Sequence, residues 1–176
     1  MADKDTPPKT EHSTEDPLLK GYQQLLDSIE TQNRQQPLTQ RIDTALEKLS
    51  ELTELTREEI DHLGDYLKRD LHAVVHYLHE TGSELESWLQ FDMALIEERL
   101  ADIVAQLADQ TQLQLSQQLN YFATEAEKSR NIHTGQIVTL GTLECQQCRH
   151  SLHFYKPGRV PPCPKCHHSH FQRTTF

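Results

Sequence analysis

The sequence has few apolar side chains for its length. Of 176 residues, 35% are hydrophobic and 6% are aromatic, whereas globular domains average about 45–50% apolar residues. No stretch approaches the roughly 20 apolar residues that span a bilayer, and the polar N-terminus lacks the apolar core of a signal peptide. These absences exclude a membrane protein and disfavour a thick layered sheet. We expect a soluble, cytoplasmic, mostly helical protein whose helices each bury one stripe.

The chain also lacks the motifs of common enzyme sites. It contains no phosphate-cradling glycine loop, no G-x-S-x-G elbow, no dinucleotide fingerprint and no H-E-x-x-H pair. Its single Glu-x-x-His pair, Glu59 and His62, is too little for a di-iron site, since such a site needs two copies and two further glutamates. We therefore predict that the protein is not an enzyme.

The N-terminal part has a helical pattern. Residues 1–17 are rich in Pro, Thr, Asp, Glu and Lys with almost nothing to bury, so we expect a disordered tail. From Leu19 apolar residues recur at three- and four-residue steps, which predicts a first helix that Pro37 terminates. The same period over residues 38–52 predicts a second helix. These helices open an acidic helical bundle or hairpin that we assign to residues 18–130.

Two longer apolar stripes predict an antiparallel αα-hairpin. Thr56 with Glu59 forms a capping box that starts a third helix, which we expect to stop at Thr81-Gly82 because glycine readily takes the left-handed C-terminal position. A short turn between stripes of matching length implies that the two helices pack face to face. The fourth helix carries a heptad seam typical of coiled coils, formed by Leu89, Met93, Ile96, Leu100, Ile103 and Leu107.

The fourth helix has no internal stop signal. Neither glycine nor proline occurs at residues 84–133, so we expect the helix to run to about Arg130, with the pair Asp109 and Gln112 marking an alternative restart. Further apolar residues lie off its seam. They predict packing against the first two helices, with homodimerisation through the helices as the alternative; these residues are Trp88, Phe91 and Leu95.

Charge and pattern both change after His133. Residues 131–176 hold five basic residues and one acid, which gives them a net charge of +4. Because the whole chain has a net charge of −10, residues 1–130 have a net charge of −14. An acidic body repels phosphate backbones, so binding to nucleic acid could rest only on the last segment. Short β-prone runs separated by proline and glycine turns predict a small β domain over residues 133–176.

The four cysteines form two C-x-x-C pairs with fourteen residues between them. Each pair can close on a metal as a tight knuckle, and two knuckles complete the tetrahedral sulfur set that zinc prefers. A reducing cytosol disfavours disulfides, and a redox C-x-x-C would need a βαβ context. Because four thiolates leave no open coordination position, we predict a zinc ribbon holding one structural Zn²⁺. The predicted ligands are Cys145, Cys148, Cys163 and Cys166.

Histidines form two further groups. His72, His76 and His79 lie on one side of the third helix, where they could bind a metal, but we interpret them as solvated residues beside the apolar stripe. A second group lies close to the cysteines. Four thiolates already fill a metal's shell, so these side chains are interpreted as surface or outer groups: His150, His153, His167, His168 and His170.

The last segment contains three characteristic runs, His133-Thr-Gly-Gln-Ile-Val, Gly141-Thr-Leu-Glu-Cys145 and Cys163-Pro-Lys-Cys166 with Phe171-Gln-Arg173. With these runs the chain resembles the YbeL-like zinc-ribbon proteins of bacteria. The similarity extends from about Leu18 to Phe176, and its most specific part is the last 44 residues. The resemblance implies a helical N-terminal region, a zinc ribbon and no established biochemical activity. The family usually has glycine directly after the last cysteine, where this chain has His167, and a positive φ angle is less comfortable for histidine than for glycine.

Two functions remain open from the sequence. The first is a protein-interaction or regulatory adaptor whose zinc holds a recognition surface for an unidentified protein partner. The second is a nucleic-acid-binding accessory protein that acts through the mildly basic ribbon. Zinc-bound thiolates offset part of the ribbon's charge, so we favour the first. The cations available to the second are Arg149, Lys156, Arg159, Lys165 and Arg173.

Overall fold

Helices precede strands along the chain, as predicted. The computed structural model describes residues 16–81, 98–109, 111, 113–114, 116–117, 131–139 and 141–174, without the side chains of 77–81 and 108. The helices are α1 (Pro17–Glu30), α2 (Leu38–Leu52), α3 (Arg57–Thr81) and α5 (Glu98–Ala108). The strands are β1 (Asn131–His133), β2 (Ile137–Val138), β3 (Gly141–Cys145), β4 (Ser151–Phe154), β5 (Gly158–Arg159) and β6 (His170–Arg173).

The side chain of Asp16 fixes the start of α1. It accepts hydrogen bonds from the backbone N–H groups of Leu18 at 3.0 Å and Leu19 at 3.4 Å, and Pro17 occupies the first helical turn. Both features favour a helix start, because the carboxylate satisfies open backbone donors and proline needs none. The helix therefore begins one residue before the predicted start of the helical region.

The predicted end of the first helix at Pro37 is wrong. α1 ends at Glu30, and Thr31 donates its hydroxyl to the backbone oxygen of Asp27 at 3.1 Å. Residues 31–36 contain no apolar side chain, so a longer helix would bury nothing, and a threonine that hydrogen-bonds locally favours a helix end.

The helical core is formed by the predicted stripes. α3 packs against α1, α2 and α5. At Gly21, α1 closely approaches the segment just before α3, since a Cβ atom at Gly21 would lie 2.5 Å from Leu55 Cδ1. One stripe residue departs from the prediction, since Leu52 at the end of α2 is 77% exposed. Fully buried members of this core include Tyr22, Leu26, Ile42, Leu63, Leu67, Leu100 and Leu107.

The capping box at the start of α3 is confirmed. Glu59 Oε2 accepts from the Thr56 backbone N–H at 2.8 Å, and the Glu59 N–H donates to Thr56 Oγ1 at 3.3 Å. The backbone N–H and hydroxyl of Thr56 lower the pKa of Glu59. Glu59 therefore caps a helix. Among the described residues it belongs to no group of converging metal-ligating side chains.

An unbroken fourth helix is not observed. α5 ends at Ala108, and a new capping box comes next, in which Gln114 Oε1 accepts from the Thr111 N–H at 2.9 Å. The alternative prediction of a restart near Asp109 is the better one, although its partner Gln112 lies outside the described residues. So do the turn at residues 82–83, the first half of the seam and the off-seam apolar residues; the described seam residues Leu100, Ile103 and Leu107 are buried.

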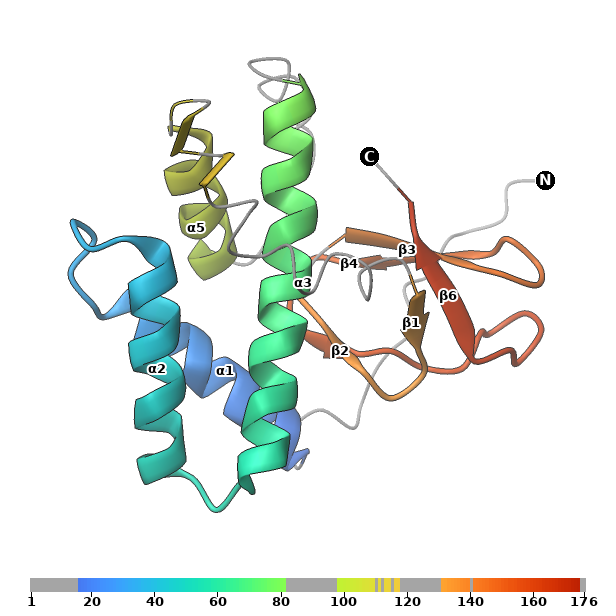
Figure 1. The fold of residues 1–176 in the computed structure, drawn as a ribbon. Coiled ribbons are helices and arrows are strands. Elements are labelled where there is room, and N and C mark those ends of the chain that lie inside the picture. Colours follow the sequence, from blue (N-terminus) through green and yellow to red (C-terminus); the bar gives the residue numbers. More distant parts are fainter. Residues whose placement is uncertain are drawn as a thin grey trace.

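The strands form two antiparallel sheets. The four-stranded sheet has the order β1-β6-β3-β4, and β2 pairs with β5 in the second. α3 lies between the other helices on one side and the strands on the other (Figure 1), and it contacts β2 directly. Strand pairing begins at Asn131, two residues before the predicted ribbon boundary. Among the described residues, no helix combines the length and hydropathy that a membrane span requires.

Candidate metal centre

The two cysteine pairs adopt the same backbone geometry. In the first knuckle the N–H of Arg149 donates to Cys145 O at 2.9 Å, and the N–H of Cys145 donates to His150 O at 3.0 Å. Arg149 has a φ angle of 59°, the left-handed conformation that turns the chain back sharply. This knuckle continues directly from β3, so the central sheet positions Cys145.

The second knuckle repeats each contact. The N–H of His167 donates to Cys163 O at 2.8 Å, and the N–H of Cys163 donates to His168 O at 3.0 Å. His167 also has a φ angle of 59°. The positive φ expected from the family's glycine is therefore present, although the side chain is histidine. The next strand along the chain, β6, pairs with β3 and brings the two knuckles together.

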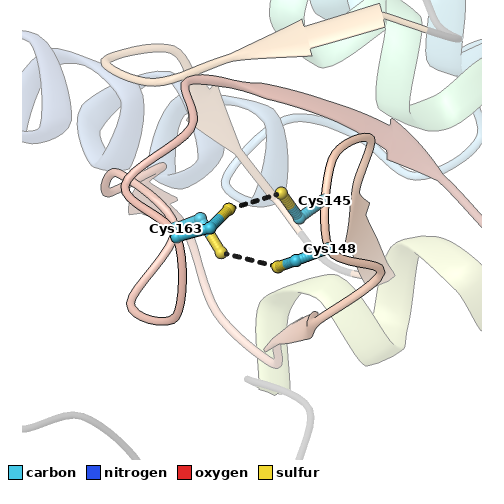
Figure 2. Close-up of side chains that lie close together, drawn as sticks. Cys145, Cys148 and Cys163 are labelled. Carbon is cyan, nitrogen blue, oxygen red and sulfur yellow. Dashed lines mark hydrogen bonds between the residues drawn. The ribbon is translucent and has the colours of Figure 1, made fainter.

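The four predicted ligands converge. Cys145 Sγ lies 3.5 Å from Cys166 Sγ, and Cys148 Sγ lies 3.5 Å from Cys163 Sγ; all four sulfur atoms are within 4.8 Å of one another. Figure 2 shows Cys145, Cys148 and Cys163 pointing toward one another across the two knuckles. A zinc–sulfur bond of about 2.3 Å places the sulfur atoms of a tetrahedral site about 3.8 Å apart. The four side chains therefore fit a zinc ion closely.

The electrostatics of the cluster favour a cation. Burial opposes ionisation of Cys163, but the backbone N–H groups of Cys166 and Lys165 and the neighbouring thiols together lower its pKa to about 7. The backbone N–H of His168 stabilises the Cys166 thiolate, yet burial and the three neighbouring sulfur atoms raise the pKa of Cys166 to about 12. Close thiolates repel one another, so a cation is required before all four can be charged.

Apolar side chains form a small core beside the knuckles. Phe171 is fully buried with Cys145 and Cys163, and Phe154 packs at the edge of this cluster. Tyr155 instead stacks on the ring of His153, with ring centroids 6.4 Å apart. The remaining members of the cluster are Ile132, Val138, Leu143, Leu152 and Val160.

The histidines of α3 form no second metal centre in the described part of the chain. The rings of His72 and His76 have centroids 5.9 Å apart, while the side chain of His79 lies outside the described residues. Partial burial, and then the charge of His76, lower the pKa of His72. Across the described residues, the four cysteines are the one group of three or more ligating side chains whose donor atoms all converge.

A buried carboxylate attaches the ribbon to the helices, which the sequence did not predict. Asp70 on α3 accepts at Oδ2 from the backbone N–H of Thr139 at 2.6 Å and from its hydroxyl at 2.7 Å. At Oδ1 it accepts from Arg69 at 2.8 Å and from Arg173 of β6 at 2.6 Å. Burial opposes ionisation of Asp70, but the two arginines outweigh it and keep its pKa below the ordinary value.

Two further residues join this buried network. Because the Thr139 hydroxyl donates to Asp70, it accepts its second hydrogen bond from the hydroxyl of Tyr22 on α1. Arg69 also donates to the backbone oxygen of Ile137 at 2.7 Å, and Ile137 itself belongs to the helical core. Helices and ribbon therefore share one hydrogen-bonded and apolar interface.

Two of the five ribbon cations form ion pairs with carboxylates outside the ribbon. The side chain of Arg173 is 7% exposed in its ion pair with Asp70. Arg159 forms a bidentate pair with Asp16, at 2.5 and 2.8 Å, and its hydrogen bonds lower the pKa of Asp16. The prediction that both guanidinium groups are available to nucleic acid does not fit these contacts. Of the residues in these buried contacts, only Arg69 and Asp70 could have been singled out from the sequence, because they are charged residues within an apolar stripe.

The chain is similar to known bacterial proteins. The family described as a zinc-ribbon containing domain matches residues 27–175. Proteins named uncharacterised protein YbeL, from Escherichia coli strain K12 and from Escherichia coli O157:H7, are each 33% identical over 164 residues. The alignment covers 90% of this chain and 97% of each relative. No solved structure matches the chain significantly.

Proposed function

Since the chain belongs to the zinc-ribbon-containing family that includes YbeL, we propose that it is a non-catalytic interaction protein in which one structural Zn²⁺ holds a recognition surface in shape. The observation that carries this proposal is the closed set of four converging sulfur atoms. Catalytic zinc keeps a coordination position for water or substrate, whereas four cysteine ligands fill the tetrahedral shell. Bound zinc would supply charge compensation for the four thiolates and a fixed geometry for both knuckles.

The tips of the two knuckles are the proposed recognition surface. Their side chains are exposed, while Cys145 and Cys163 beneath them are buried. A ligand set shared between the two knuckles fixes the tips relative to each other, which lowers the entropic cost of binding a partner. The tip residues are Gln146, Gln147, Pro164 and Lys165.

Protein is favoured over nucleic acid as the partner. Arg173 and Arg159 already pair with the carboxylates of Asp70 and Asp16, so two of the five ribbon cations have their charge compensated within the chain. The segment over residues 1–130 carries −14 and repels phosphate backbones. A protein partner in the cytoplasm fits these charges better, because only one of the four tip residues, Lys165, is charged.

In-cell crosslinking and pull-down test the proposal with three full-length chains. The native chain should retain partners that Cys163→Ser loses, because the serine variant cannot complete the zinc site. A Gln147→Ala/Lys165→Ala variant, which keeps all four ligands, should bind zinc normally and lose the same partners. An identical partner set in all three would contradict the idea that the ribbon recognises a protein.

The nucleic-acid alternative is tested by salt. Phosphate contacts make affinity fall steeply between low and moderate salt, so the zinc-loaded chain is titrated into labelled RNA and DNA at both. We expect no measurable binding at low salt. Salt-sensitive binding that Lys165→Ala weakens would favour the alternative and contradict a protein-directed surface.

A further inference from the structure

Three histidines gather on the ribbon beside the second knuckle. His133 lies on β1 and is the direct antiparallel partner of His170 on β6. His168 precedes His170 by two residues, the spacing that places side chains on one face of an extended chain. His133 and His170 are exposed, and His168 is half-buried. The closed cysteine site uses none of these imidazoles as a ligand.

The rings already have the spacing of imidazoles that share a metal. The ring centroids of His133 and His170 are 4.5 Å apart at an interplanar angle of 88°, and those of His168 and His170 are 5.1 Å apart at 34°. A zinc–nitrogen bond of about 2.0–2.1 Å puts a ring centroid about 3.2 Å from the metal, so two imidazoles on one tetrahedral ion have centroids about 5 Å apart. The observed distances lie close to this value.

We propose that His133, His168 and His170 form a second, exchangeable zinc site. Imidazole nitrogen suits zinc, and three such ligands leave the fourth position open to water or to a donor from another molecule. His170 Nδ1 lies 3.1 Å from the hydroxyl of Ser169. That contact orients the ring and leaves Nε2 as the metal-binding nitrogen, the arrangement common around histidine ligands.

Closure of this site requires only side-chain rotation. The donor nitrogens of the three rings do not all converge in the structure as the four sulfur atoms do. His133 and His170 make an edge-to-face contact, so one ring presents its face to the other. To bind a shared metal, that ring must turn until a nitrogen points toward the ion. Exposed imidazoles rotate about χ2 at low cost, because this torsion is broad. The strand pairing of β1 and β6 meanwhile holds the Cα atoms of His133 and His170 in register.

Cobalt and zinc titration of the full-length chain tests the proposal. Co²⁺ added to metal-free protein should first give the thiolate charge-transfer absorption of the cysteine site. A second equivalent should then bind without further thiolate absorption, and Zn²⁺ competition against a chromophoric chelator should likewise count two sites. The His133→Asn/His168→Asn/His170→Asn variant should keep the first equivalent and lose the second.

His150 supplies a matched control. It comes after the first knuckle as His168 comes after the second, and it is exposed, so His150→Asn should retain both equivalents. His72→Asn/His76→Asn should also retain both. The proposal is overturned if the native chain binds one equivalent, if the triple variant still binds two, or if the α3 variant loses the second. Retained thiolate absorption in the triple variant shows that its ribbon is folded.

Discussion

Two residues in the left-handed backbone region close the knuckles. Arg149 and His167 each have a φ angle of 59°, and each comes directly after the second cysteine of its pair. The backbone N–H of each donates to the carbonyl of the first cysteine, so the positive φ is part of the turn that brings the two sulfur atoms together. A side chain at such a position costs roughly 1–2 kcal/mol relative to glycine.

We predict that His167→Gly stabilises the zinc-loaded chain. Relief of the backbone strain exceeds the added entropy of glycine in the unfolded chain, so the free energy of unfolding should rise by about 0.5–1 kcal/mol. Urea unfolding followed by circular dichroism measures the change. Arg149→Gly is the matched control and should behave alike. A loss of stability in His167→Gly alone would show that this imidazole contributes contacts of its own.

Asp70 is the second residue whose environment sets a clear expectation. Asp70→Asn should lower the free energy of unfolding by about 3–5 kcal/mol, because two buried guanidinium groups lose their counter-charge. The exposed pair Arg34–Asp102 offers the control, and Asp102→Asn should cost less than about 1 kcal/mol. Equal effects of the two changes, measured by urea unfolding at neutral pH, would contradict the role of burial.

The same carboxylate has a predictable pH dependence. Its pKa is lower in the folded chain than its ordinary value, so the unfolded chain takes up the proton first as pH falls. The contribution of Asp70 is therefore complete above about pH 4 and is lost below it.

At the scale of elements, helix starts were predictable where a short motif closes on itself. Thr56 and Glu59 satisfy each other within one turn, so their pattern needs no distant partner. Helix ends were less predictable. α1 stops at Glu30 and α5 at Ala108 without a proline or glycine, because the segments directly after them, residues 31–36 and 109–112, are entirely polar and offer nothing to bury.

We predict that Thr56→Ala destabilises the chain by about 1 kcal/mol through loss of this cap. The exposed hydroxyl of Ser50 at the end of α2 donates to the backbone oxygen of Glu47. Ser50→Ala is a suitable control, with an expected change within about 0.5 kcal/mol. Thermal unfolding of both variants in the presence of zinc compares them. A neutral Thr56→Ala would mean that packing alone determines where α3 begins.

At the scale of the whole molecule, the metal centre and the helices are linked through β6. This strand carries Phe171, which pairs with Cys145, and Arg173, which reaches Asp70 on α3. Structural zinc supplies about 10–16 kcal/mol of binding free energy at neutral pH, comparable with the whole stability of a domain. The ribbon should therefore unfold without its metal and leave Asp70 with Arg69 alone.

We predict that chelation of zinc weakens the helical core as well as the ribbon. Amide hydrogen exchange in α3 around Asp70 should become faster in metal-free protein, with a smaller change in α2. Asp70→Asn should show part of this acceleration with zinc still bound. Unchanged exchange in α3 after chelation would mean that the helices and the ribbon are stable independently.

The sequence by itself identified the four cysteines whose sulfur atoms converge and most of the buried faces of the described helices. Both depend on local rules, since two residues separate the cysteines of a knuckle and the apolar stripes repeat at the helical period. Only the tertiary structure decided how the two parts join. The hydrogen bonds of Asp70 span 69 residues to Thr139 and 103 to Arg173. No local pattern shows that a charge is buried, because burial depends on which distant segments pack around it.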